Sequence, residues 1–167
     1  RGDIGYLRIN QFRETTADDV DNAFDAFNQQ EIHGIVLDLR SNPGGLLRSA
    51  VEVASDFLAP GQLIVYTQGK RPREDYVAEA GKQKKQYPLI VLVNGGSASG
   101  SEIVAAAIKD HGRGLVIGTK TFGKASVQQV FPLSGGAAVK LTIAHYYSPK
   151  GNDIHNVGIA PDIEDPW

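Results

Sequence analysis

The stretch GIVLDLRSNPGG, residues 34–45, decides the fold class of this chain. Its first half, Gly34 to Leu39, is a short apolar run of the kind that forms a buried strand. Its second half, Arg40 to Gly45, has the Asn, Pro and Gly composition of a turn. Apolar residues then recur at helical spacing from Leu46 to Leu58. The stretch therefore predicts a strand, a glycine-rich turn and a helix in succession.

The same unit occurs again further along the chain. Leu89 to Val93 predicts a second buried strand, Asn94-Gly95-Gly96 a turn, and Ser99 to Lys109 a second helix. Upstream, Ile4 to Phe12 has strand composition. It leads to a helix near Thr16, where Thr16 and Asp19 have the spacing of a capping box.

Further strands are expected at Gln62–Gln68, Asp75–Ala80, Leu115–Gly118, Ser126–Phe131, Ala137–Ile143 and Ala144–Tyr147. Strands that alternate with helices predict an α/β fold with a partly parallel sheet. The length, 167 residues, suits one domain, which we expect to span residues 1–167.

Composition excludes several classes of function. Cysteine is absent, so disulfides, thiolate metal sites and cysteine nucleophiles are excluded. The net charge is −2, from 17 basic and 19 acidic residues, which argues against nucleic-acid and membrane-surface binding. No apolar run approaches the roughly 20 residues of a membrane span. Because Arg1 stands where an initiator methionine would, we expect the natural protein to be longer.

Three glycine-rich loops follow or join the predicted strands: Asn42–Gly45, Asn94–Gly100 and Gly118–Lys124. Ligand sites in α/β folds collect at the carboxyl ends of the strands. These loops are therefore the first candidates for a functional site.

Ser99 lies at a predicted junction of strand and helix. Backbone N–H groups at the start of a helix lack intrahelical partners and could stabilise an oxyanion beside a serine nucleophile. The G-x-S-x-G pattern does not fit, because Ser97 and Ser101 occupy the glycine positions. The local sequence equally suits a helix-capping serine, so both roles remain open.

Lys124 ends the segment Gly118 to Lys124, which fits G-x-x-x-x-G-K. A phosphate loop requires Ser or Thr next and then a helix, whereas Ala125 and a β-like segment follow, so nucleotide binding is disfavoured. A buried lysine has a lowered pKa, and its neutral amine could accept a proton from serine. Gln128 could hold that amine. A solvated loop lysine is the alternative.

Histidine and metal chemistry receive less support. Four histidines permit a Ser-His-Asp triad, but none lies in a turn that suggests one. No H-x-x-x-H spacing occurs, so we expect no zinc site and no metal or other cofactor.

Taken together, the segments 34–45, 93–103, 118–128 and 140–163 resemble the carboxyl-terminal processing proteases, also called tail-specific proteases, of the Ser-Lys peptidase family S41. The last segment contains Gly158-Ile159-Ala160-Pro161-Asp162-Ile163. The resemblance covers nearly the whole chain in the order of the family's motifs. It implies a ClpP/crotonase-like α/β spiral of β-β-α units and a serine endopeptidase that cleaves proteins near the C-terminus.

The resemblance also assigns roles to residues. The nucleophile falls on Ser99 and the general base on Lys124, 25 residues apart as in the family. The glutamine that orients the lysine falls on Gln128. The oxyanion donors fall on the N–H of Gly100 and of either Gly44 or Gly45. Gly100 and Ala125 replace residues that are often Ala and Gly in the family.

The resemblance further implies protein or peptide substrates with apolar C-termini, an oligomer as one option, and a location outside the cytoplasm, in the periplasm, the cell envelope or the thylakoid lumen. Members usually carry a PDZ domain and flanking helices, which we expect outside these 167 residues.

Two alternatives to an active peptidase follow from the same fold. One is a non-catalytic module that binds a hydrophobic ligand or a peptide. The other is a protease core that is inactive without its PDZ domain. Ser99, Lys124 and Gln128 occur together, which favours an enzyme over a binding module.

Overall fold

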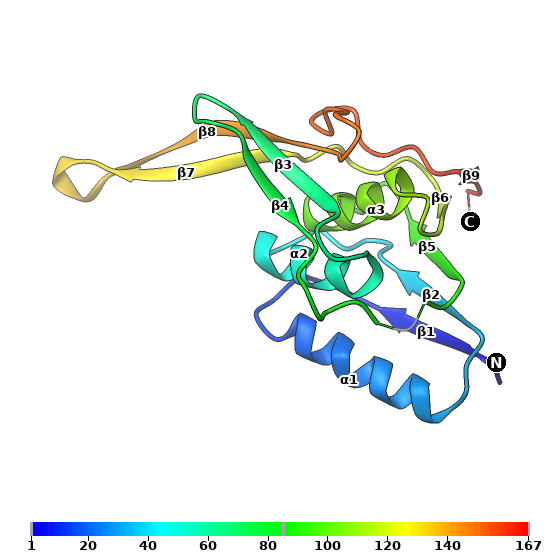
Figure 1. Cartoon of the computed structure of the whole chain (residues 1–167). Helices are drawn as coiled ribbons and strands as arrows, with labels where there is room; N and C mark the ends of the chain where they lie inside the picture. Colours follow the sequence, from blue (N-terminus) through cyan, green and yellow to red (C-terminus); the bar gives the residue numbers. More distant parts are fainter. Residues whose placement is uncertain (1, 85, 167) are drawn as a thin grey trace.

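The computed structural model describes residues 2–84 and 86–166, so Arg1, Lys85 and Trp167 of the expected domain lie outside the described residues. Figure 1 shows the arrangement of its helices and strands. The helices are α1 (Thr16–Gln29), α2 (Leu47–Phe57) and α3 (Gly100–Asp110), with a single 3₁₀ turn at Ser134–Gly136. The strands are β1 (Ile4–Arg8), β2 (Gly34–Asp38), β3 (Leu63–Gly69), β4 (Glu74–Val77), β5 (Leu89–Val93), β6 (Leu115–Gly118), β7 (Ser126–Pro132), β8 (Ala138–Tyr147) and β9 (Ile163–Glu164).

The strands form two sheets. The first has the order β1-β2-β5-β6-β9, and all of its pairs are parallel. The second has the order β4-β3-β8-β7 and is antiparallel. The expected α/β fold with a partly parallel sheet is therefore confirmed.

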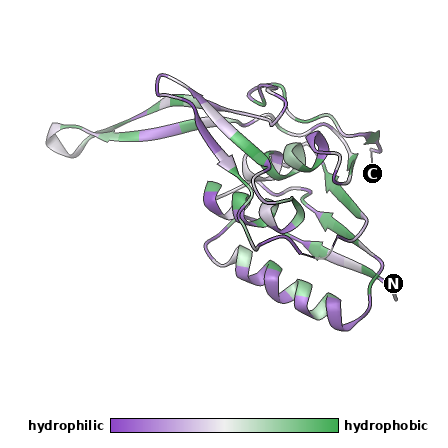
Figure 2. Ribbon diagram, viewed as in Figure 1, coloured by the Kyte–Doolittle hydropathy of each residue, from purple (hydrophilic) through white to green (hydrophobic). Residues whose placement is uncertain are grey.

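The core lies where the helices meet these sheets. Leu37, Val91 and Val116, on neighbouring parallel strands, are fully buried. Helix α3 contacts α2, β6 of the first sheet and β3 of the second. Figure 2 shows the matching hydropathy, with hydrophobic residues along β2 and β5 and a polar stripe on α1. No helix within the described residues is long and apolar enough to cross a membrane.

The hairpin of β7 and β8 extends away from the rest of the fold (Figure 1). Its outer part carries exposed apolar side chains, including Val130 and Leu141. The two separate strands expected over residues 137–147 form one continuous strand, β8.

The expected capping box at Thr16 and Asp19 is wrong. Helix α1 begins at Thr16 itself, and its N-cap is Thr15, which makes no side-chain capping bond. The Thr16 hydroxyl instead accepts the N–H of Arg13 at 2.9 Å and donates to the carbonyl of Gln11 at 3.2 Å. It closes the turn that precedes the helix.

Asp56, on α2, is a buried carboxyl whose oxygens have no hydrogen-bond partner within the described residues. Burial and then the negative charge of Asp21 raise its pKa to about 7, although Lys84 and Lys82 partly oppose the shift. The folded chain then binds more protons than the unfolded chain between the two pKa values of this group. Stability contributed here is present below pH 3.8 and is lost as pH rises towards 7.

We therefore expect Asp56→Asn to stabilise the chain at pH 8, by up to about 4 kcal/mol, and to have little effect near pH 4. Urea unfolding at both pH values measures this difference. The exposed carboxyl of Asp25 on α1 supplies the control, Asp25→Asn, which should show no such dependence. If the free energy of unfolding depended on pH in the same way in the parent and in Asp56→Asn, the prediction would be contradicted.

Candidate active site

The three glycine-rich loops meet at the carboxyl ends of β2, β5 and β6. The N–H of Ala98 donates to the carbonyl of Asn42 at 2.9 Å, which joins the first loop to the second. The N–H of Phe122 donates to the carbonyl of Ser97 at 3.0 Å, which joins the second to the third. Parallel strands bring their carboxyl ends to one edge of the sheet, so segments distant in sequence become neighbours.

Ser99 is the half-buried N-cap residue of α3 and lies on a strained turn. Its φ is 54° and its ψ is −113°, a conformation that residues other than glycine rarely adopt. Ser99 and Glu102 form a capping box. Ser99 thus has the capping role, and this role is compatible with a nucleophilic one, because the turn that caps the helix also puts the side chain beside the helix N-terminus.

Gly44 packs directly against Ser99. A Cβ at Gly44 would lie 2.6 Å from the Cβ of Ser99, so only glycine fits. The N–H of Gly44 is buried and donates to Oδ1 of Asn42 at 2.8 Å. Asn42 in turn donates to the carbonyl of Ile9 at 2.8 Å. The N–H of Gly44 is thus already used within the loop.

Gly45 and Gly100 differ from Gly44 in this respect. Within the described residues, neither backbone N–H has a protein acceptor. Gly45 is exposed, and Gly100 is the first residue of α3, where the N–H of a helix is normally left without an intrahelical partner.

Glu102, which the sequence analysis did not single out, links the candidate residues. Its carboxylate is fully buried, and Glu102 is the third residue of α3, in the first turn of that helix. Oε2 accepts the N–H of Ser99 and the N–H of Lys124, each at 2.9 Å. Because both bonds end on the same oxygen, the backbone nitrogens of Ser99 and Lys124 are less than twice 2.9 Å apart.

The other oxygen of Glu102 binds the loop that carries Lys124. Oε1 accepts the N–H of Gly123 at 2.6 Å and the hydroxyl of Thr121 at 2.5 Å. Thr121 Oγ1 also accepts the N–H of Ile159 at 2.7 Å. The S-x-x-E spacing from Ser99 to Glu102 was the available sequence signal, but it indicates only a capping box. The contacts with the lysine loop come from the tertiary fold.

The structure distinguishes the two alternatives for Lys124, a buried amine held by Gln128 and a solvated loop lysine. Both side chains are exposed, and no hydrogen bond joins them in the part of the chain described. The structure thus brings the backbones of Ser99 and Lys124 together, whereas the lysine side chain is open to solvent. Of the two alternatives left open by the sequence, a solvated loop lysine is the one found in the chain by itself.

The histidines take other roles. His111 contacts the carbonyl of Leu63 through Nε2 at 2.7 Å, and the rings of His145 and His155 lie 4.2 Å apart between centroids. No histidine hydrogen-bonds Ser99 in residues 2–84 and 86–166. Within the same residues, the structure groups no three acidic or histidine side chains that could hold a metal ion.

An ion pair between buried Asp38 and half-buried Arg40 supports the start of the first loop. Asp38, the last residue of β2, accepts from Nη2 of Arg40 at 2.7 Å and from the hydroxyl of Tyr6 at 2.5 Å. Burial by itself would raise the pKa of Asp38, but the hydrogen bonds from Arg40 and Tyr6 outweigh it and lower the pKa to about 2. Asp38 is thus ionised at neutral pH and fixes the chain where it leaves the strand.

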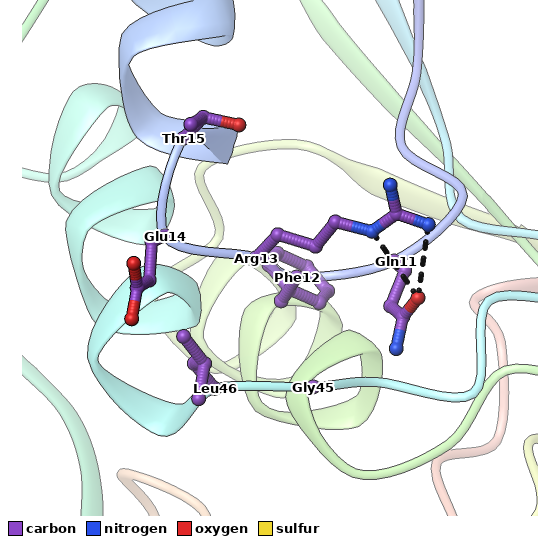
Figure 3. Close-up of a pocket in the computed structure, with 7 residues that line it drawn as sticks. All are labelled: Gln11, Phe12, Arg13, Glu14, Thr15, Gly45 and Leu46. Carbon is purple, nitrogen blue, oxygen red and sulfur yellow. Dashed lines mark hydrogen bonds between the residues drawn. The ribbon is translucent and has the colours of Figure 1, made fainter.

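A pocket of about 450 Å³ lies beside Gly45 (Figure 3). Phe12 and Leu46 supply apolar surface to it, and Leu46 is 48% exposed. The guanidinium of Arg13 donates to Oε1 of Gln11 at its rim. The pocket therefore offers a place for an apolar group next to Gly45.

The fold and loop arrangement define an α/β protein with a serine-bearing site at the carboxyl ends of parallel strands. Comparison with known proteins agrees with this class: the model of peptidase family S41 matches residues 3–165. The chain belongs to this family.

The relatives and solved structures support the assignment. The chain is 48% identical to the carboxy-terminal-processing protease of Bartonella bacilliformis and 41% identical to the carboxyl-terminal-processing protease of Synechocystis. These matches cover 97% and 98% of this chain but 38% of each relative. The solved photosystem II D1 C-terminal processing protease matches with a TM-score of 0.92 and 39% identity, over 98% of this chain and 42% of that chain.

Proposed function

We propose that this chain is the catalytic core of a serine endopeptidase that cleaves protein chains near the C-terminus. The observation that carries the proposal is the carboxylate of Glu102, which holds the backbones of Ser99 and Lys124 on one oxygen. A shared anchor of this kind keeps a nucleophile and a base in register. The resemblance of the surrounding motifs to the family supports the same roles.

The proposed reaction begins with Ser99. Its Oγ attacks the carbonyl carbon of the scissile peptide bond while its proton passes to the neutral amine of Lys124. The resulting ammonium gives this proton to the leaving nitrogen as the C–N bond breaks. Water then attacks the acyl-enzyme, again with Lys124 as base, and releases Ser99. Gln128 would orient the amine once a substrate is bound.

The N–H groups of Gly100 and Gly45 would stabilise the oxyanion. Gly45 is favoured over Gly44 because the N–H of Gly44 already donates to Asn42, whereas Gly45 is exposed. The pocket beside Gly45 would then receive an apolar side chain of the substrate next to the scissile bond.

The exposure of Lys124 favours a specific variant of this proposal. A general base must be neutral, and exclusion of water favours the neutral form of a lysine. A bound substrate would exclude water here, and so would another part of a longer protein, such as the PDZ domain that the family pattern implies. The core would then be chemically complete but weakly active until it is covered.

Substrates with apolar C-termini, an oligomeric state and a location outside the cytoplasm are proposed on family grounds. Two relatives are named as chloroplastic, from Tetradesmus obliquus and Arabidopsis thaliana. A bacterial periplasm or cell envelope would be the corresponding location in a bacterium.

The test is digestion of a loosely folded protein with an apolar C-terminal tail, followed by mass spectrometry of the fragments. We expect cuts near the tail with the parent chain and none with Ser99→Ala. Cleavage only by a longer protein that includes a PDZ domain would support the variant with a covered lysine. Cleavage by Ser99→Ala at the parent's rate would overturn the proposal.

A further inference from the structure

Strand β7 forms an outer edge of the second sheet and begins at Ser126, two residues after Lys124. Within the described residues it pairs only with β8. The edge therefore starts beside the candidate base and continues along the projecting hairpin (Figure 1).

The hydrogen bonds at both ends of this hairpin identify which backbone groups face the free edge. At the tip, the N–H of Leu133 donates to the carbonyl of Ala137 at 2.8 Å. At the base, the N–H of Tyr146 donates to the carbonyl of Ala125 at 2.8 Å. In an antiparallel ladder the backbone N–H and C=O groups of every second residue bond to the partner strand. Ala125 and Leu133, at opposite ends of the hairpin, both bond to the partner side, and both are odd-numbered.

The alternation is unbroken along β7, because the register shift between Val127 and Gln128 places the additional residue on β8. Odd-numbered residues of β7 consequently bond to β8. The N–H and C=O groups of three even-numbered residues point to the free edge: Ser126, Gln128 and Val130.

The two edges of this sheet are protected differently. The opposite edge, β4, carries Glu74 and Asp75, and charges of this kind discourage another strand from pairing. β7 has the sequence SVQQVFP, with no charged residue, and only Pro132 at its far end blocks pairing. The edge beside Lys124 is thus the one left open to an added strand.

We propose that the free edge of β7 binds the main chain of the substrate as an additional strand, paired through Gln128 and Val130. This inference rests on the proposed peptidase function and specifies the substrate as an extended, locally unfolded polypeptide. Such pairing gives affinity through the backbone, independently of sequence. It would also direct the substrate along β7 towards Lys124 and partly cover that side chain.

The first test measures binding without turnover. Affinity for a short fluorescent peptide with an apolar C-terminus is measured by anisotropy in a Ser99→Ala background. Val130→Pro removes an N–H that faces the free edge and breaks no bond to β8, whereas the matched Val130→Ala keeps the N–H and shortens the same side chain. We expect the proline variant to bind about fivefold to tenfold more weakly than the alanine variant. Equal affinities with equal melting temperatures would overturn the proposal.

The second test leaves the protein unchanged and alters the peptide. Peptides are N-methylated at one backbone amide at a time. A paired strand uses the amides of every second residue, so affinity should fall with a period of two along the peptide. A uniform loss, or none, would contradict strand pairing. This test does not depend on how any variant folds.

Failure of the edge proposal differs from failure of the proposed function. If neither the parent chain nor a longer protein that includes a PDZ domain cuts peptides, but the alternating N-methyl effect persists, the edge binds peptides and the peptidase function is wrong. If cleavage depends on Ser99 and the N-methyl effect is absent, the peptidase function is supported and the proposal of strand pairing at the β7 edge is wrong. If Val130→Pro converts a dimer to a monomer in sedimentation and peptide affinity is unaffected, the edge pairs with a second copy and the proposal is overturned.

Discussion

Replacement of Ser99 or of Lys124 by alanine is expected to lower kcat for peptide cleavage at least about a thousandfold. Ser99→Ala removes the only oxygen of the proposed nucleophile, and Lys124→Ala removes the amine that would take its proton. The folded state should persist in both variants. Ser99→Ala keeps the Cβ that packs on Gly44, and the exposed side chain of Lys124 leaves its backbone bond to Glu102 intact. Steady-state kinetics on a quenched fluorescent peptide and thermal melts measure the two effects.

The double variant distinguishes a dyad from two independent contributions. Residues that act as one unit give strongly non-additive losses, so Ser99→Ala with Lys124→Ala should be no slower than either single variant. A matched control is Lys120→Ala, which removes an exposed lysine from the same loop and should keep near-parental rates. Multiplicative losses in the double variant would show that the two residues do not act together.

Glu102→Gln is expected to have the second largest effect, on stability as well as on activity. The carboxylate accepts four hydrogen bonds, from Ser99, Thr121, Gly123 and Lys124, and is fully buried. A glutamine amide has only one acceptor oxygen, so its NH₂ group would face either the N–H groups of Ser99 and Lys124 or the N–H of Gly123. We expect a loss of about 3 to 5 kcal/mol in the free energy of unfolding. The melting temperature should fall by about 10 °C or more.

Activity should fall further than stability alone requires, because the anchor shared by Ser99 and Lys124 is lost. Measurement well below the melting temperature separates the two effects. The matched control is Glu52→Gln, which removes the ion pair between Glu52 and the exposed Arg48 on α2. It should lower the free energy of unfolding by at most about 1 kcal/mol. A fully stable Glu102→Gln variant would contradict the role of this carboxylate.

Much of the fold was predictable because burial imposes a regular pattern on the sequence. The apolar runs of β2 and β5 are continuous because both faces of a parallel sheet are covered, and the glycine-rich turns after them mark the carboxyl ends. The same reasoning identifies the three loops as candidates for a site, and the structure brings them together. Thr16 was misjudged because its hydroxyl serves the preceding turn, and several hydroxyls near a helix start compete for such bonds.

The candidate site was predictable only in part. Ser99 and Lys124 were identified from their motifs, but Glu102 contacts Gly123 and Lys124 across more than 20 residues of sequence. Such a contact depends on how β5, α3 and β6 are arranged, and no local pattern encodes it. The sequence leaves burial or exposure of Lys124 open for a similar reason, since apolar neighbours in sequence do not determine whether a loop is covered in space.

The bond between Ala98 and Asn42 has a consequence for how this protein acquires its chemistry. It closes a segment of more than 50 residues, and the neighbouring parallel pairs also join distant parts of the chain. Closure of such long segments costs conformational entropy before any contact compensates it, which makes folding slow. The proposed oxyanion donors and the two proposed reacting side chains come from segments that meet only after this closure. A newly synthesised chain would therefore remain harmless to its neighbours until the whole α/β layer has formed.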